Sequence, residues 1–107
     1  MTDTPKIDWP GKSGTTYTHS IHPIGTTFKE TPANFVFAKE ASPEMWVPIY
    51  IGQTKNLSDR KLSLEKEEAA KRNGATHIHI YPTTDSENAR IAREKDLITQ
   101  WKPTCNA

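Results

Sequence analysis

The fold is decided by the stretch WVPIYIG, residues 46–52, which is apolar on both faces when it is extended. Successive side chains of a strand point to opposite sides, so this run predicts a strand that is covered on both sides. Pro48 has no N–H group to donate to a neighbouring strand, and it therefore predicts an edge or a bulge at that position. The other elements can be placed outward from this strand.

Short alternating or apolar runs predict further strands at residues 17–21, 34–38 and 76–81. One helix is predicted from the N-cap Asn56 to about residue 72, and a second from the capping box that starts at Thr84 to about Trp101. The order strand, strand, strand, helix, strand, helix indicates an α+β, or mixed α/β, fold.

Composition limits the class of protein. The chain has 107 residues, of which 34% are hydrophobic, so it can form one modest core. No apolar run approaches the ~20 residues that span a bilayer, and the single Cys105 excludes a disulfide scaffold. The start of the chain lacks a signal-peptide pattern, which predicts a cytoplasmic protein. A net charge of +1 does not by itself indicate a nucleic-acid-binding protein.

Residues 1–15 are polar and rich in turn-forming residues, namely Pro5, Pro10, Gly11 and Gly14. They predict a flexible leader, because such a segment has little apolar surface to bury. We expect a single domain over residues 16–107.

A carboxylate lies in the apolar stripe of the second predicted helix. At about 100° per residue, Glu94 falls in the middle of a face formed by Ile91, Leu97, Ile98 and Trp101. A carboxylate in that position is costly unless it is paired, hydrogen-bonded or bound to a cation. A salt bridge to Arg90, or a side chain reaching solvent at the edge, is the common explanation. The functional alternative is a carboxylate held in a cleft for metal binding or acid–base work.

The segment that begins at Tyr50 resembles the second motif of the GIY-YIG nuclease superfamily. That motif reads Tyr-(Ile/Val)-Gly, then Thr, an aliphatic residue and an arginine on the next helix, and the corresponding residues are Tyr50, Ile51, Gly52, Thr54, Leu57 and Arg60. The family's metal-binding glutamate, in an E-x-x-L-I pattern followed by proline and asparagine, corresponds to Glu94, with Pro103 and Asn106 after it. The resemblance extends over residues 35–106 and includes short, stand-alone bacterial and phage-like members.

The resemblance implies a small antiparallel sheet of three or four strands flanked by helices. It also implies a divalent-metal-dependent endonuclease that hydrolyses DNA phosphodiester bonds. Tyr50 would orient or deprotonate the attacking water, Arg60 would bind phosphate, and Glu94 would hold Mg²⁺ or Mn²⁺. Asn106 would pack or hydrogen-bond beside the site as a supporting residue.

Two departures from the family pattern lower the activity that we expect. The first motif, normally Gly-Ile-Tyr, reads Asn34-Phe35-Val36, or takes the register that ends at Phe37, and in both cases the tyrosine hydroxyl is missing. Leu64 stands where family nucleases commonly place His or Tyr. One alternative is therefore a catalytically impaired nucleic-acid- or protein-binding module. Another is a subunit whose protein partner supplies the affinity for DNA, since the net charge is low.

Other residues are candidates for contacts with nucleic acid. Lys55, Arg60 and Lys61 can offer phosphate contacts next to the Tyr50 motif. His77 and His79 share one face of a strand, but a zinc site needs three or four protein ligands. Polar packing on the sheet is the favoured interpretation for the two histidines, and a role of His77 or His79 in a nucleic-acid groove stays open.

Overall fold

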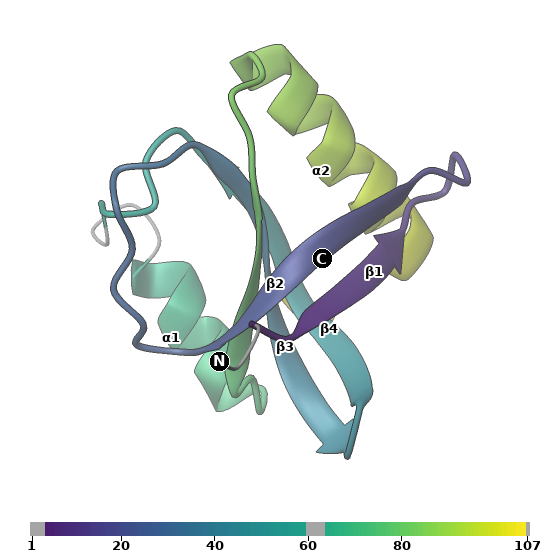
Figure 1. The fold of residues 1–107 in the computed structure, drawn as a ribbon. Coiled ribbons are helices and arrows are strands. Elements are labelled where there is room, and N and C mark those ends of the chain that lie inside the picture. Colours follow the sequence, from purple (N-terminus) through teal and green to yellow (C-terminus); the bar gives the residue numbers. More distant parts are fainter. Residues whose placement is uncertain (1–3, 60–63, 107) are drawn as a thin grey trace.

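The computed structural model describes residues 4–59 and 64–106. In this part of the chain, five antiparallel strands form one curled sheet that two helices flank (Figure 1). In chain order the elements are β1 (Lys6–Pro10), β2 (Thr16–Pro23), β3 (Ala33–Ser42), β4 (Met45–Thr54), α1 (Leu64–Arg72), β5 (His77–Pro82), α2 (Glu87–Trp101) and the 3-10 turn η1 (Thr104–Asn106). The α+β class is confirmed, and the sheet is larger than the expected three or four strands. No helix of the described ranges is long and apolar enough to cross a membrane.

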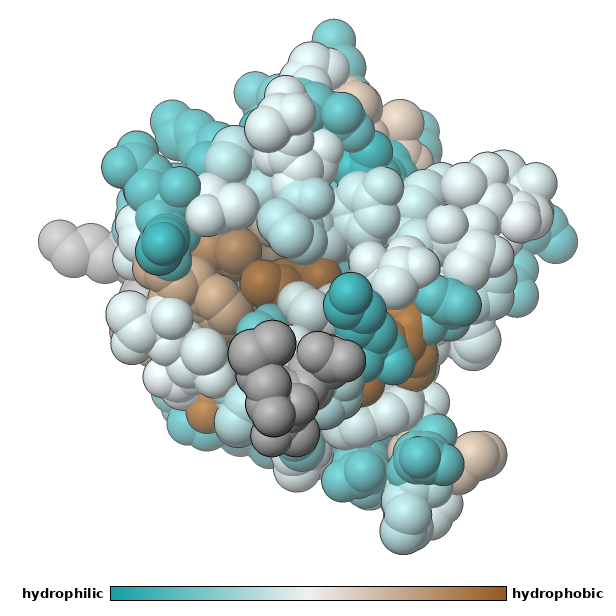
Figure 2. Space-filling model, viewed as in Figure 1, coloured by the Kyte–Doolittle hydropathy of each residue, from teal (hydrophilic) through white to brown (hydrophobic). Residues whose placement is uncertain are grey.

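Strand β3 lies inside the sheet, whose order is β1-β2-β5-β3-β4. Every residue from 33 to 38 is buried, because β4 and β5 pair with this strand on its two sides and a helix covers each face. Phe35 and Phe37 belong to the core on the α1 side, whereas Val36 and Ala38 belong to the core on the α2 side. Figure 2 shows apolar surface gathered beside β5 on the face in view, with polar residues around it.

Strand β4 is at the edge of the sheet and carries a bulge, as predicted from Pro48. The register pairs Phe37 with Tyr50 and then Ala38 with Pro48, so that Ile49 is an extra residue. An extra residue reverses the alternation of side chains along a strand. Ile49 and Tyr50 consequently both pack on the α1 side.

The N-terminal segment differs from the flexible leader that the sequence predicted for residues 1–15. Strand β1 pairs with β2, and the Trp9 side chain is only 3% exposed. Its Nε1–H donates to Nδ1 of His79 at 2.9 Å, and Nε1–H of Trp101 donates to the Pro10 carbonyl at 2.8 Å. The prediction is wrong for residues 6–10, because a single buried tryptophan fixes a segment whose other residues are mostly exposed.

Both helices begin later than the sequence predicted. The Asn56 side chain accepts hydrogen bonds from the backbone and hydroxyl of Ser58 and forms a local turn, and α1 is described from Leu64 onward. The N-cap of α2 is Ser86, whose hydroxyl accepts the N–H of Ala89. Both starts contain several Asn, Ser or Thr residues able to cap a helix, so local pattern alone does not select among them.

The face that α2 turns toward the sheet is rotated relative to the predicted stripe. Leu97 is fully buried, as expected, but Ile91 is 44% exposed and Arg90 is 6% exposed. Arg90 takes an inward position because its long aliphatic stem can be buried while its guanidinium finds polar partners. Glu94, next to this face, is partly buried.

Two histidines are buried in the core on the α2 side. His79 accepts the Trp9 N–H at Nδ1, so its Nε2 carries the hydrogen; His19 faces the Tyr17 carbonyl with Nδ1 at 2.9 Å, so its Nε2 has the lone pair. Neither Nε2 atom has a hydrogen-bond partner among the described residues. Burial lowers the pKa of His19 to about 4 and that of His79 to about 3. These contacts support polar packing for His79, and a protonated Nε2 does not ligate zinc.

Acidification from pH 7 to pH 5 is expected to destabilise the fold through His19 and His79. Above the usual pKa of 6.5 both are neutral whether the chain is folded or unfolded. Below it the unfolded chain binds protons that the folded chain excludes, so the free energy of unfolding falls as the pH falls. The expected slope approaches about 1.4 kcal/mol per pH unit for each histidine, measured by urea unfolding with tryptophan fluorescence.

The interval between pH 5 and 6.5 separates these histidines from Asp85 and Asp96, whereas Glu94, whose pKa burial raises, acts in the opposite direction, because the folded chain binds its proton more tightly. Hydrogen bonds to the side chains of Asp85 and Asp96 lower their pKa below the usual 3.8, so these groups act mainly at lower pH. Burial also lowers the pKa of His22, which adds to the same interval. His19→Gln, which keeps a donor for the Tyr17 carbonyl, should reduce the pH dependence. A free energy of unfolding that stays constant from pH 7 to 5 contradicts the assigned effect of burial.

Candidate functional site

Tyr50 and Gly52 make one unit with Phe35 on the α1 side of the sheet. The ring of Tyr50 lies 6.1 Å from that of Phe35 and 6.2 Å from that of Phe37, measured between centroids. A Cβ atom at Gly52 would lie 2.7 Å from Cζ of Phe35 and 2.8 Å from Cε2 of Tyr50. Glycine is therefore required because two aromatic rings converge on the space that a side chain would fill.

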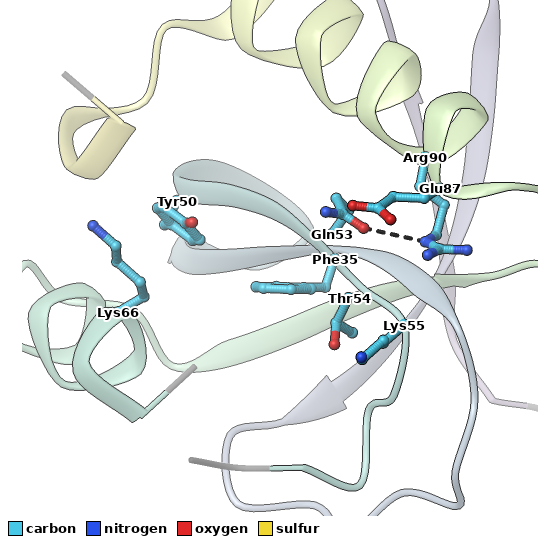
Figure 3. A pocket seen from close by; sticks show the side chains of 8 residues that line it. All are labelled: Phe35, Tyr50, Gln53, Thr54, Lys55, Lys66, Glu87 and Arg90. Carbon is cyan, nitrogen blue, oxygen red and sulfur yellow. Dashed lines mark hydrogen bonds between the residues drawn. The ribbon is translucent and has the colours of Figure 1, made fainter. Parts of the chain in front are cut away.

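A pocket of about 280 Å³ opens beside these rings (Figure 3). Its lining comes from β3, β4, the loop after β4, α1 and α2, and consists of Phe35, Tyr50, Gln53, Thr54, Lys55, Lys66, Glu87 and Arg90. Figure 3 shows Tyr50 and Lys66 toward one end, and Glu87 and Arg90 toward the other. The pocket therefore joins the edge strand to the starts of both helices.

Glu94 and Tyr50 interact electrostatically. Burial raises the pKa of Tyr50, and the negative charge of Glu94 raises it further. Burial also raises the pKa of Glu94, which has no hydrogen-bond or ion-pair partner among the described residues. The salt bridge to Arg90, the common explanation for a carboxylate here, is not formed. A partly buried, unpartnered carboxylate close to a phenol has the character of a ligand for a cation.

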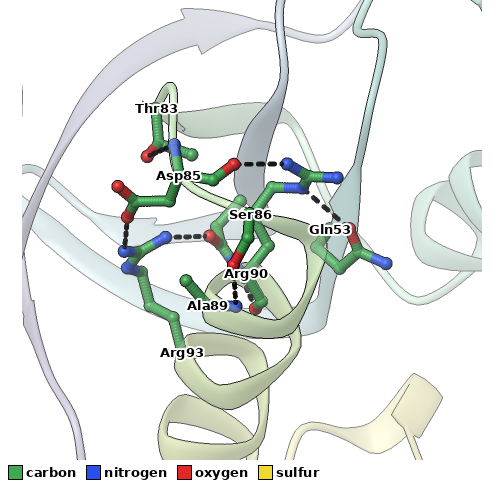
Figure 4. Close-up of polar contacts among 8 residues, drawn as sticks. Gln53, Thr83, Asp85, Ser86, Ala89, Arg90 and Arg93 are labelled. Atoms are coloured by element: carbon green, nitrogen blue, oxygen red, sulfur yellow. Dashed lines mark hydrogen bonds and ion pairs between the residues drawn. The ribbon is translucent and has the colours of Figure 1, made fainter.

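Arg90 instead belongs to a hydrogen-bonded network that fixes α2 on the sheet (Figure 4). Its Nε donates to Oε1 of Gln53 at 3.1 Å, and a terminal nitrogen donates to the Asp85 carbonyl at 3.0 Å. The buried Asn34 side chain donates to the Arg90 carbonyl at 2.9 Å and accepts from Arg93 at 2.7 Å. Arg93 also pairs with the Asp85 carboxylate. The network positions the helix that carries Glu87 and Glu94.

The charges around the pocket are divided between its walls. Lys55 and Lys66 are exposed, and neither forms an ion pair with another described residue. The Lys66 ammonium lies 5.7 Å from the centre of the Tyr50 ring. Carboxylates come from α2, with Glu87 in the lining and Glu94 near Tyr50. The sequence does not predict Lys66 and Glu87 as site residues. In the sequence, Lys66 is one charge of a mixed helix face and Glu87 is part of a capping box. Only tertiary packing brings the two side chains to the pocket.

Asn106 hydrogen-bonds to β4, the strand that carries Tyr50. Its Oδ1 accepts the N–H of Ile51 at 2.8 Å, and its Nδ2 donates to the carbonyl of Ile51 at 2.9 Å. Because β4 is an edge strand, these backbone groups have no strand neighbour on that side. The side-chain amide satisfies both and holds the C-terminal turn next to Tyr50.

Of the remaining predicted site residues, only His77 is described, and it lies away from this pocket. Arg60 and Lys61 lie outside the described residues. Leu64, at the start of α1, is 51% exposed. The His77 ring packs edge-on against Trp46 at 4.9 Å, on the other side of the sheet from Tyr50. His77 is thereby separated from the candidate site.

No group of three or more His, Cys, Asp or Glu side chains that could hold a metal ion occurs in residues 4–59 and 64–106. Mg²⁺ differs from zinc in this respect, because it is commonly held by one or two carboxylates and keeps several waters. A single carboxylate, that of Glu94, meets this smaller requirement, whereas Glu87 lies about two helical turns earlier on α2, toward the other end of the pocket (Figure 3).

Comparison of the chain with family models, with curated proteins and with solved structures gives no match. The chemistry of the site is therefore argued from its geometry.

Gly52→Ala is expected to lower the free energy of unfolding by about 1–3 kcal/mol, because the added methyl group must displace the Phe35 or the Tyr50 ring. Urea unfolding gives the energy, and changed ring-proton shifts in NMR spectra locate the displacement. In a double-mutant cycle with Phe35→Leu, which replaces one of the two rings by a smaller side chain, the double variant should lose less stability than the sum of the two single losses. A Gly52→Ala chain as stable as the natural one contradicts the proposed crowding.

Proposed function

We propose that this protein is a divalent-metal-dependent endonuclease of the GIY-YIG kind that hydrolyses DNA phosphodiester bonds with low activity. The proposal depends on one observation: Tyr50 lines a pocket together with Lys55 and Lys66, and its phenol feels the charge of the Glu94 carboxylate, which has no hydrogen-bond or ion-pair partner among the described residues. Hydrolysis of a phosphodiester needs a positioned water and neutralisation of the phosphate charge. A cation held by Glu94 would position the water, and Lys55 and Lys66 would neutralise the phosphate charge.

The topology supports the proposal. The β3–β4 hairpin, α1, β5 and α2 follow one another, and the strands pair in the order β5-β3-β4. These three strands and two helices are compatible with the small antiparallel sheet flanked by helices that the resemblance implies, although they belong to a sheet of five strands. Strands β1 and β2 extend the sheet beyond β5, at the edge away from Tyr50.

Glu94 is the residue that would hold Mg²⁺ or Mn²⁺, because its carboxylate is partly buried and has no partner in the described part of the chain. Glu87, in the pocket lining, is the second carboxylate within the same helix. A bound divalent cation supplies charge neutralisation on the phosphate and an activated water.

The raised pKa of Tyr50 bears on its role. Part of that rise comes from the charge of Glu94, which a cation bound there would offset. The hydroxyl can both donate and accept hydrogen bonds, and by resemblance Tyr50 would orient or deprotonate the attacking water. As the water oxygen bonds to phosphorus, the bond to the leaving oxygen breaks; the attacking water gives up one proton to the surrounding solvent, and the leaving oxygen takes up one proton from it. Lys55 and Lys66 balance the phosphate charge during this step. Arg60 has the same role by resemblance.

A catalytically impaired binding module is the second candidate, and specific residues favour it. Phe35 is packed beside Tyr50 without a hydroxyl, and the exposed Leu64 offers no group that handles protons. General acid–base help is typically worth ~10²–10⁴-fold, so its loss lowers turnover without harming the fold. A protein partner that supplies DNA affinity is compatible with either function.

The natural chain should nick supercoiled plasmid slowly with Mg²⁺ or Mn²⁺, and Glu94→Gln should reduce the rate by about 10²-fold or more, because the amide is a far weaker cation ligand. Glu65→Gln, which removes an exposed carboxylate from the first turn of α1, is the control and should cut at the natural rate. Nicking that persists in EDTA, or that Glu94→Gln leaves unchanged, rejects this mechanism. Absence of nicking together with retained metal binding favours the binding module.

Phe35→Tyr should increase the nicking rate by roughly 10-fold or more, up to the ~10²–10⁴-fold typical of acid–base assistance, because it adds a hydroxyl to the pocket lining. Phe37→Tyr is the matched control: Phe37 is 1% exposed and does not line this pocket, so its hydroxyl should cost stability without a gain in rate. The gain from Phe35→Tyr should disappear when Glu94→Ala is added. Equal rates for Phe35→Tyr and the natural chain mean that the missing phenol does not limit turnover.

A further inference from the structure

Lys66 is the described cation that approaches Tyr50 most directly. It lies in the first turn of α1, and Figure 3 shows its side chain extended toward the tyrosine at one end of the pocket. Its ammonium is 5.7 Å from the ring centre and makes no ion pair with any other described residue. Lys71 on the same helix, in contrast, pairs with Glu68 at 3.8 Å. Lys66 is thus left available at the site even though Glu65 and Glu67 are its neighbours in the chain.

The position of this ammonium matches the charges on the other side of Tyr50. The Glu94 carboxylate acts on the phenol from α2, whereas Lys66 reaches it from α1. With a divalent cation bound to the Glu94 carboxylate and a phosphate oxygen bound to the Lys66 ammonium, negative and positive charges would alternate from one side of Tyr50 to the other. Lysine binds phosphate as a compact point charge with three donors, which suits a site without fixed bidentate geometry.

We propose that Lys66 binds the scissile phosphate over the Tyr50 ring and stabilises the negative charge of that phosphate during hydrolysis. The inference rests on the proposed function and deepens it. It adds a substrate-contacting residue two positions along the chain from Leu64. Because the lysine is exposed, its replacement leaves the core intact.

Two variants and one control test this role. Lys66→Met keeps the aliphatic stem against Tyr50 and removes the charge, whereas Lys66→Arg keeps the charge. Lys71→Met is the control, because it removes an α1 lysine that does not line the pocket. One measurement is the salt dependence of binding to a fluorescent duplex in EDTA, followed by anisotropy. The other is the plasmid nicking rate with Mn²⁺.

Lys66→Met should flatten the slope of log K against log salt by about 0.9, the value for one lost phosphate contact. It should also reduce the nicking rate by about 10-fold or more, and Lys66→Arg should restore most of both. Lys71→Met should leave slope and rate unchanged. If Lys66 only covers the tyrosine ring, Lys66→Met keeps the natural slope, and that result overturns the inference.

The other outcomes separate this inference from the proposed function. A natural chain that binds DNA without cutting it contradicts the nuclease function, while a flattened slope in Lys66→Met still supports a phosphate contact. A chain that cuts DNA with Lys66→Met at the natural rate and slope overturns the role of Lys66 alone. Equal flattening by Lys66→Met and Lys71→Met, or a natural chain that binds no DNA, also overturns it.

Discussion

The candidate site depends on one extra residue in strand β4. Trp46 packs on the α2 side of the sheet, and regular alternation would place Tyr50 and Gly52 on that side too. The bulge at Ile49 reverses the alternation, so that the tyrosine meets Phe35 on the α1 side. On the α2 side the Tyr50 ring would find no space, because other side chains already fill the core there. The bulge is tolerated because β4 is an edge strand and Pro48 has no N–H to leave unpaired.

The second requirement of the site is the placement of α2, which polar contacts fix at two levels along the helix. Near its start, the buried Asn34 amide accepts from Arg93 and donates to the backbone of the helix. Further along, the Asp96 carboxylate accepts from the N–H and hydroxyl of Ser13 and from the Tyr17 hydroxyl, at 2.7–2.8 Å. The N-terminal strands therefore help to set the position of Glu94 although they lie far from it in sequence. Residues within the segment that composition alone predicts to be a flexible leader therefore support the site, because they hold α2 in place.

Much of the sheet could be predicted from the sequence, because alternating patterns and turn residues are local signals. Tyr50, Glu94 and Asn106 were singled out by residue pattern and family resemblance before any geometry was known. The predictions that were wrong concern features that depend on tertiary contacts. Strand β1 is fixed by one tryptophan hydrogen-bonded to a distant histidine. The face of α2 was misjudged because Arg90 counts as polar although its stem is buried. Lysines that gather only in three dimensions have no local signature.

The contact between Asn106 and Ile51 also affects how molecules of this protein meet one another. An exposed edge strand presents free N–H and C=O groups, which invite pairing with the edge of another chain. The Asn106 amide occupies both groups of Ile51 on the open side of β4, on a strand whose exposed side chains include Met45 and Val47. The last turn of the chain thereby blocks intermolecular strand addition at the site itself. We expect the loss of the contact between Asn106 and Ile51 to cause self-association in concentrated solution before it causes any change in the core.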